Sequence, residues 1–172
     1  MNIKVVGQQV LNVGDQEKSV VISLLERTGS QITPRVWELI ERRGLDDATP
    51  NSQRGLKVVC LVPELKTTLE YAENILFQNF LKFVHRLYGL VPCPFEVGIR
   101  LFLEKAGLLL SDSNERIVLD DYTVVVLEDP THGQHLAIEP CKGRHYLDVH
   151  SVHEEYHVKD RRPMLFVKEQ VA

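Results

Sequence analysis

This chain has 172 residues, a formal net charge of −4 and three cysteines. Its length is sufficient for a single domain with its own core, so folding requires neither a disulfide nor a metal. The charge balance lacks the basic excess of most nucleic-acid-binding proteins, and no C-x-x-C pair indicates a thiolate zinc site. No apolar run could cross a membrane and no secretion leader is evident, so we expect one soluble, cytoplasmic domain over residues 1–172.

The N-terminal half is expected to be mostly helical. Apolar spacing, turn residues and prolines predict strands at Ile3–Val6 and Val10–Val13, helices at residues 16–28 and 34–43, a strand at Lys57–Val62, and helices at about residues 64–88 and 95–106. Residues 46–56 are turn-forming and lack an apolar period, so they are interpreted as a loop and as the boundary of any subdomains. The wide apolar stripe of residues 64–88 predicts the central core helix.

From Leu108 onward the apolar period changes to two. Short runs between turns predict strands at Arg116–Leu119, Tyr122–Leu127, Gln134–Glu139, Arg144–Val149 and Met164–Lys168. Two of these turns are expected at Asp129–Gly133 and Cys141–Gly143. We therefore predict an α+β fold in which an N-terminal helical layer packs on a C-terminal antiparallel sheet, at about residues 108–168.

Six of the seven histidines lie in the last quarter of the chain, two of them in the string His153-Glu154-Glu155-Tyr156-His157. On a helix, His153 and His157 lie one turn apart and can bind one metal ion, while Glu154 activates water. The spacing of a capping box at the start of the string favours this helix. The strand pattern that precedes it favours an extended chain, in which the two histidines lie about 13 Å apart. Both conformations of residues 151–161 stay open.

A zinc site would need a further ligand from upstream. The hypothesis of a zinc-dependent hydrolase assigns Glu154 as general base and, as metal ligands, His153, His157, His150 and Asp148, with Glu128, His132 and His135 as further candidates. Outside this hypothesis no cofactor is expected. Without a metal, the histidine cluster is interpreted as solvated polar groups on an exposed sheet face, or as groups that make a binding surface respond to pH.

The leading interpretation is a non-enzymatic binding protein. Aromatic residues of the predicted core helix could line a ligand cavity between helices and sheet, so the partner would be a small ligand or an unidentified protein, including a second copy of the chain. A third hypothesis is DNA binding, because residues 19–45 and 95–127 are similar to a winged-helix arrangement. The mixed charges of the helix at residues 34–43 argue against it.

Overall fold

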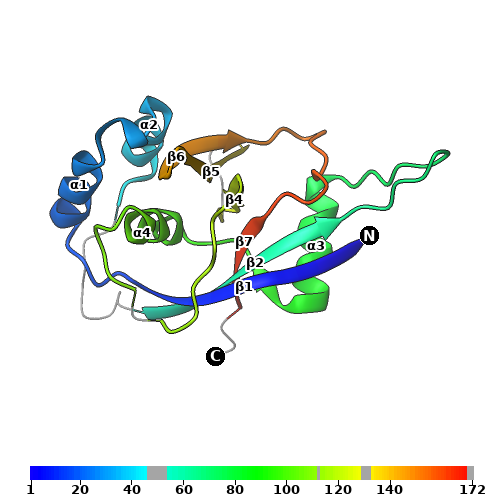
Figure 1. Cartoon of the computed structure of the whole chain (residues 1–172), viewed down its shortest axis with the longest axis horizontal. Coiled ribbons are helices and arrows are strands. Elements are labelled where there is room, and N and C mark those ends of the chain that lie inside the picture. Colours follow the sequence, from blue (N-terminus) through cyan, green and yellow to red (C-terminus); the bar gives the residue numbers. More distant parts are fainter. Residues whose placement is uncertain (46–53, 112, 129–132, 170–172) are drawn as a thin grey trace.

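The computed structural model describes residues 1–45, 54–111, 113–128 and 133–169, and over these ranges the α+β class is confirmed (Figure 1). The strands are β1 (Asn2–Val13), β2 (Arg54–Glu64), β3 (Leu90–Val91), β4 (Thr123–Val125), β5 (Gln134–Cys141), β6 (Arg144–Ser151) and β7 (Met164–Lys168). They form one mainly antiparallel sheet in the order β1-β2-β7-β4-β5-β6, with β3 beside β7. The helices are α1 (Lys18–Arg27), α2 (Pro34–Arg43), α3 (Phe77–Tyr88) and α4 (Phe95–Lys105).

Strand β1 is continuous over 12 residues, where the sequence predicts two short strands, Ile3–Val6 and Val10–Val13, on either side of Gly7-Gln8-Gln9. The predicted interruption is not formed, because the chain stays paired with β2 through one register shift next to Gly7. Gln9 is buried, and its side-chain amide donates to Oε2 of Glu104 at 2.6 Å and accepts from the backbone N–H of Ile117 at 3.1 Å. The glutamine therefore connects β1 to α4 and to the segment that follows α4.

Three predicted helices are confirmed as α1, α2 and α4, with ends that move by at most two residues. Pro34 occupies the first turn of α2, and the hydroxyl of Thr33 donates to Oδ1 of Asp148 at 2.7 Å instead of capping the helix. That bond ties the start of α2 to β6. Helix α4 lies directly on β5, since a Cβ added at Gly98 would be 2.6 Å from Cδ1 of Leu136.

The predicted core helix at residues 64–88 is only half present. Helix α3 begins at Phe77, and the residues before it form a hairpin that projects from the molecule (Figure 1). The projecting hairpin (residues 65–76) contains one backbone bridge, between Thr67 and Ala72, and Leu69 at its tip is fully exposed. An apolar helical stripe forms a helix only where packing stabilises it, and residues 66–72 of this segment are exposed.

Four of the predicted C-terminal strands are confirmed as β4 to β7, whereas Arg116–Leu119 forms no strand. Strand β7 pairs in parallel with β4 and antiparallel with β2. The N-terminal strands therefore belong to the sheet that the sequence analysis confines to residues 108–168. The predicted loop at residues 46–56 and turn at Asp129–Gly133 fall mainly outside the described residues, although β2 takes up the last three residues of the loop.

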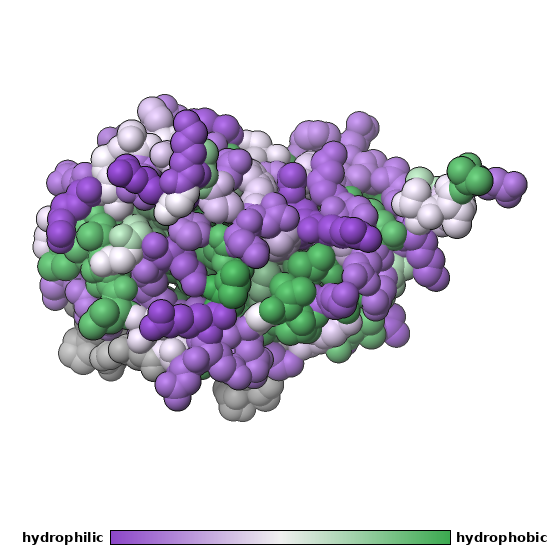
Figure 2. All heavy atoms as spheres, viewed as in Figure 1, coloured by the Kyte–Doolittle hydropathy of each residue, from purple (hydrophilic) through white to green (hydrophobic). Residues whose placement is uncertain are grey.

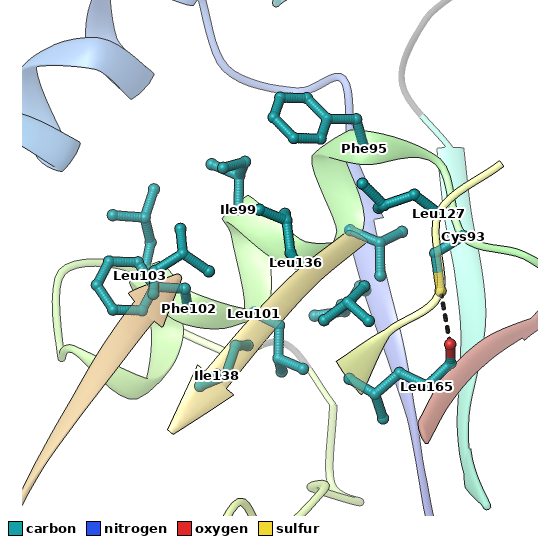
Figure 3. Close-up of a cluster of buried hydrophobic side chains, with 14 of the residues drawn as sticks. Cys93, Phe95, Ile99, Leu101, Phe102, Leu103, Leu127, Leu136, Ile138 and Leu165 are labelled. Atoms are coloured by element: carbon teal, nitrogen blue, oxygen red, sulfur yellow. Dashed lines mark hydrogen bonds between the residues drawn. The ribbon is translucent and has the colours of Figure 1, made fainter. Parts of the chain in front are cut away.

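The sheet separates two apolar clusters, because alternate residues of β2, β4 and β7 belong to different clusters. The first cluster lies against α1, α2 and α4, and Figure 3 shows part of it. Within it, the Cys93 thiol donates to the carbonyl oxygen of Leu165 at 3.4 Å. The second cluster lies against α3 and includes Phe80, Val84 and Phe166. The candidate site lies on the face of this second cluster.

Candidate ligand-binding site

Two histidines face each other across β5 and β6. These strands are joined by a tight turn at Lys142 and Gly143, whose φ values of 50° and 77° are those of a two-residue hairpin loop. The register that follows pairs His135 with His150. Leu136, next in β5, belongs to the cluster under α4, so the histidines lie on the opposite face, toward α3.

His135 is 2% exposed and has one fixed hydrogen bond. Its Nδ1 accepts from the backbone N–H of Leu127 at 2.9 Å. A neutral imidazole carries one proton, so that proton is on Nε2, which has no hydrogen-bonding partner among the described residues. Burial, and then the charges of His150 and Arg43, lower the pKa of His135 to about 4. The ring is therefore a neutral donor near neutral pH.

His150 lies between two tyrosine hydroxyls. Its Nδ1 is 2.8 Å from Oη of Tyr122, and its Nε2 is 3.0 Å from Oη of Tyr156. Since a neutral imidazole has one donor and one acceptor nitrogen, one hydroxyl donates to the ring and the other accepts from it. Burial, followed by the guanidinium groups of Arg162 and Arg35, lowers the pKa of His150 to about 4. Both histidines of the pair are therefore uncharged at neutral pH.

Aromatic rings surround the histidine pair. The ring of Phe77, the first residue of α3, meets His135 edge-on at 5.5 Å between centroids and meets Tyr156 at 5.9 Å. The guanidinium carbon of Arg162 lies 4.6 Å from the centroid of Tyr122. Edge-on contacts of this kind add a modest stabilisation to the burial of the rings. They hold both imidazoles in fixed orientations on this face of the sheet.

A cavity of about 550 Å³ opens beside His135, between α3 and the ends of β4, β5 and β6. Its walls are mainly apolar, and the residues that line it are Phe77, Leu81, Pro92, Leu127, Gly133, Val152, His135, Gln78, His153 and Glu154. The buried residues among them, including His135, form the floor, whereas Gln78, His153 and Glu154 are exposed at the rim. A second cavity near Arg100, at about 50 Å³, has room for only a few water molecules.

Residues 151–161, all of which are described, contain no helix, and β6 ends at the first of them. A tight turn follows, in which the N–H of Tyr156 donates to the carbonyl oxygen of His153 at 2.9 Å. His157 forms a backbone bridge with Leu76, at the base of the projecting hairpin. Residues 153–157 are therefore not helical, and His153 and His157 do not lie one turn apart on a helix face.

The other residues of the zinc hypothesis have different contacts. In the part of the chain that the structure describes, no group of three or more His, Cys, Asp or Glu residues is placed to hold a metal ion. Both ring nitrogens of His150 face tyrosine hydroxyls, and Asp148 accepts from Thr33. Glu154 lies at the rim of the cavity, and His132 lies outside the described residues. The zinc-dependent hydrolase stays a prediction that this geometry does not support.

The DNA-binding hypothesis finds its helices in α1, α2 and α4 but not its hairpin. The predicted hairpin after α4 is not formed, because residues 113–122 contain no strand. On α2, Arg42 donates to the side chain of Gln134, and Arg43 donates to the carbonyl oxygen of Glu128 at 3.2 Å. The helix also carries Glu38 and Glu41, so its charges are of mixed sign.

No protein-family model, curated protein or solved structure matches this chain. None of its described helices is long and apolar enough to cross a membrane. The histidine pair and its cavity are therefore the features of the molecule that bear on function. The sequence analysis missed Tyr122 and Tyr156, which are distant from each other in the chain, whereas Phe77 is one of the aromatic residues of the predicted core helix that were expected to line a ligand cavity.

Proposed function

We propose that this protein binds a small, largely apolar molecule in the cavity beside His135. The volume of about 550 Å³ falls in the range of small-molecule sites, which is roughly 300–1,000 Å³. Such sites combine apolar walls with a few polar groups that orient the ligand. Here the walls come from α3 and the strand ends, and the buried polar group is His135. This imidazole, with Nδ1 bonded to the backbone and Nε2–H without a protein partner in a mainly apolar cavity, carries the proposal.

The position of the cavity also supports the proposal. Leu127 follows β4, His135 lies at the start of β5, and Val152 follows β6, so three neighbouring strands contribute to the same end of the sheet. Phe77 and Leu81 lie one helical turn apart on α3 and close the opposite wall. Helix α3 and the start of β5 therefore supply part of the wall, and segments that directly adjoin strand ends supply the rest.

Methyl NMR of the full chain tests the proposal, with acetophenone as the probe. We expect saturable shifts at the methyl groups of Leu81, Leu127 and Val152. Leu81→Trp fills the cavity from α3 and should weaken binding at least tenfold. Leu87→Trp makes the same change on the same helix at an exposed position outside the cavity, so it should bind as the wild type does. Equal binding by the two variants, or no saturable shift at these methyl groups, would contradict the proposal.

The projecting hairpin favours a second candidate function, association with a second copy of the chain. Leu69 at its tip is fully exposed and Tyr71 is 60% exposed, and Figure 2 shows apolar atoms at the end of the projection. A short two-stranded hairpin is marginally stable by itself in water, and a contact with another chain would stabilise it.

Sedimentation equilibrium over a range of concentrations tests this second candidate. We expect reversible self-association that Leu69→Glu removes. Leu110→Glu is the matched control, since Leu110 is 86% exposed at a distant place in the sequence. A wild-type protein that stays monomeric at all concentrations, or equal effects of the two substitutions, would rule the candidate out.

A further inference from the structure

We propose that the ligand of this cavity is an uncharged molecule whose carbonyl-type oxygen accepts a hydrogen bond from the Nε2–H group of His135. This inference depends on the proposed function, because it names the class of ligand that the same cavity selects. Its structural basis is the position of a single proton on a buried ring.

The backbone fixes that proton. The N–H of Leu127 can only donate, and it points to Nδ1 of His135 at 2.9 Å. The Nδ1 atom must therefore keep its lone pair, and the neutral ring carries its hydrogen on Nε2. A side-chain hydroxyl in place of Leu127 N–H could reverse its role and allow the other tautomer. A backbone amide cannot, so the site offers a donor and never an acceptor at this point.

The Nε2–H group has no partner among the described residues, although His135 is 2% exposed. Among the described residues, the fully buried side-chain atom without a partner is Nε of Arg100 and not Nε2 of His135, which agrees with an N–H group that is accessible from the cavity. Since His135 is also a lining residue of the cavity, an acceptor atom on a ligand can complete the hydrogen bonding of this ring. Apolar walls around the donor then favour a ligand that is apolar apart from that atom.

The charges around the cavity favour a neutral acceptor over a carboxylate. His135 itself is uncharged near neutral pH, because burial lowers its pKa to about 4. Glu154 at the rim repels an anion, and His153 beside it is exposed to solvent. Arg43, whose charge also lowers the pKa of His135, is not a lining residue of the cavity. Its guanidinium carbon lies 5.1 Å from the ring centroid of Phe95. A carboxylate would therefore lose its hydration without meeting a cation in the cavity.

A matched set of probes on the wild-type protein tests the inference without any substitution. Acetophenone and α-methylstyrene have the same shape, but only the ketone has an acceptor oxygen, and benzoate carries a charge. One neutral hydrogen bond corresponds to about a two- to tenfold difference in affinity, so acetophenone should bind more tightly than α-methylstyrene by that factor. The ketone alone should shift the Nε2–H resonance of His135, and benzoate should bind more weakly than the ketone.

The outcomes separate the inference from the proposed function. Equal affinities of the ketone and the hydrocarbon at the cavity would overturn the inference and leave cavity binding intact. Tighter binding of benzoate would overturn the uncharged class. No binding of any probe would overturn the proposed function, and the inference with it. His135→Phe, which keeps an aromatic ring but has no donor, should bring the ketone and the hydrocarbon to equal affinity; if it does not fold, the wild-type comparison alone decides.

Discussion

His135 and His150 are Cα partners across β5 and β6, and burial lowers the pKa of both imidazoles to about 4. The ordinary value is about 6.5, so the unfolded chain binds more protons than the folded chain between these two values. The pair therefore stabilises the folded state above pH 6.5 and loses this contribution as the pH falls toward 4. Near neutral pH, these histidines add no positive charge to the protein.

The first prediction concerns this pH dependence. The free energy of unfolding, measured by urea denaturation, should decrease by about 1–3 kcal/mol per buried histidine between pH 6.5 and pH 4. His135→Phe should reduce the slope, because one of the two differences in proton binding is removed. A stability that is constant over this pH range would contradict the prediction.

The second prediction concerns the hydroxyl groups around His150. Tyr156→Phe removes the group 3.0 Å from Nε2, which leaves a half-buried ring nitrogen without a partner and should reduce the free energy of unfolding by about 1–2 kcal/mol. Tyr71→Phe makes the same change on the exposed hairpin and should have no measurable effect. If both variants unfold at the same urea concentration, the contact of Tyr156 with His150 contributes nothing to stability.

The third prediction concerns two glycines with similar backbone angles. Gly133 and Gly143 have φ values of 68° and 77°, so an alanine at either should cost about 1–2 kcal/mol in backbone strain. At Gly133 a Cβ would also lie 2.0 Å from the carbonyl oxygen of Val152, whereas at Gly143 it meets nothing within 4 Å. Gly133→Ala should therefore lower the melting temperature more than Gly143→Ala does. Equal melting temperatures would contradict the close approach of Gly133 to the backbone of Val152.

The fourth prediction concerns the cysteines. Cys141 is exposed, whereas Cys60 and Cys93 are buried. Burial raises the pKa of the Cys60 thiol to about 12 and raises that of Cys93 further, and thiolates are the reactive form. A disulfide reagent such as DTNB should therefore titrate one thiol per native chain and all three in denaturant. Cys141→Ser should reduce the native value to zero; rapid reaction of a second thiol would contradict the burial.

Much of the fold follows from local sequence patterns. The helices α1, α2 and α4 combine apolar spacing with clear stops, and the strands β5 and β6 are bounded by recognisable turns. The helix at residues 64–88 is overpredicted because Leu65, Leu69 and Leu76 happen to repeat at helical intervals. Periodicity alone does not reveal that Leu69 contacts no core. Similarly, Gln9 lies between the two short strands that the local pattern predicts, and its side chain is bonded to Glu104, which is far along the chain.

The candidate site was less predictable, because its residues converge only in three dimensions. One signal was available: His135 and His150 are each the seventh residue outward from the turn residues Lys142 and Gly143, so a two-residue hairpin loop pairs them. The string from His153 to His157 instead predicts a metal site, because its spacing is that of a zinc-binding helix. Nothing in the sequence places Phe77 against His135, since helix α3 reaches that face only when the sheet is assembled.

The position of β7 has a consequence for synthesis on the ribosome. This strand is the last of the sheet to emerge, yet it lies between β2 and β4. It therefore connects the pair β1 and β2 to the strands β4, β5 and β6. A nascent chain that lacks it has two incomplete half-sheets, each with an open hydrogen-bonding edge that invites pairing with other chains. Removal of a few residues near position 165 should therefore divide the sheet in two, a larger effect than trimming a peripheral strand would have.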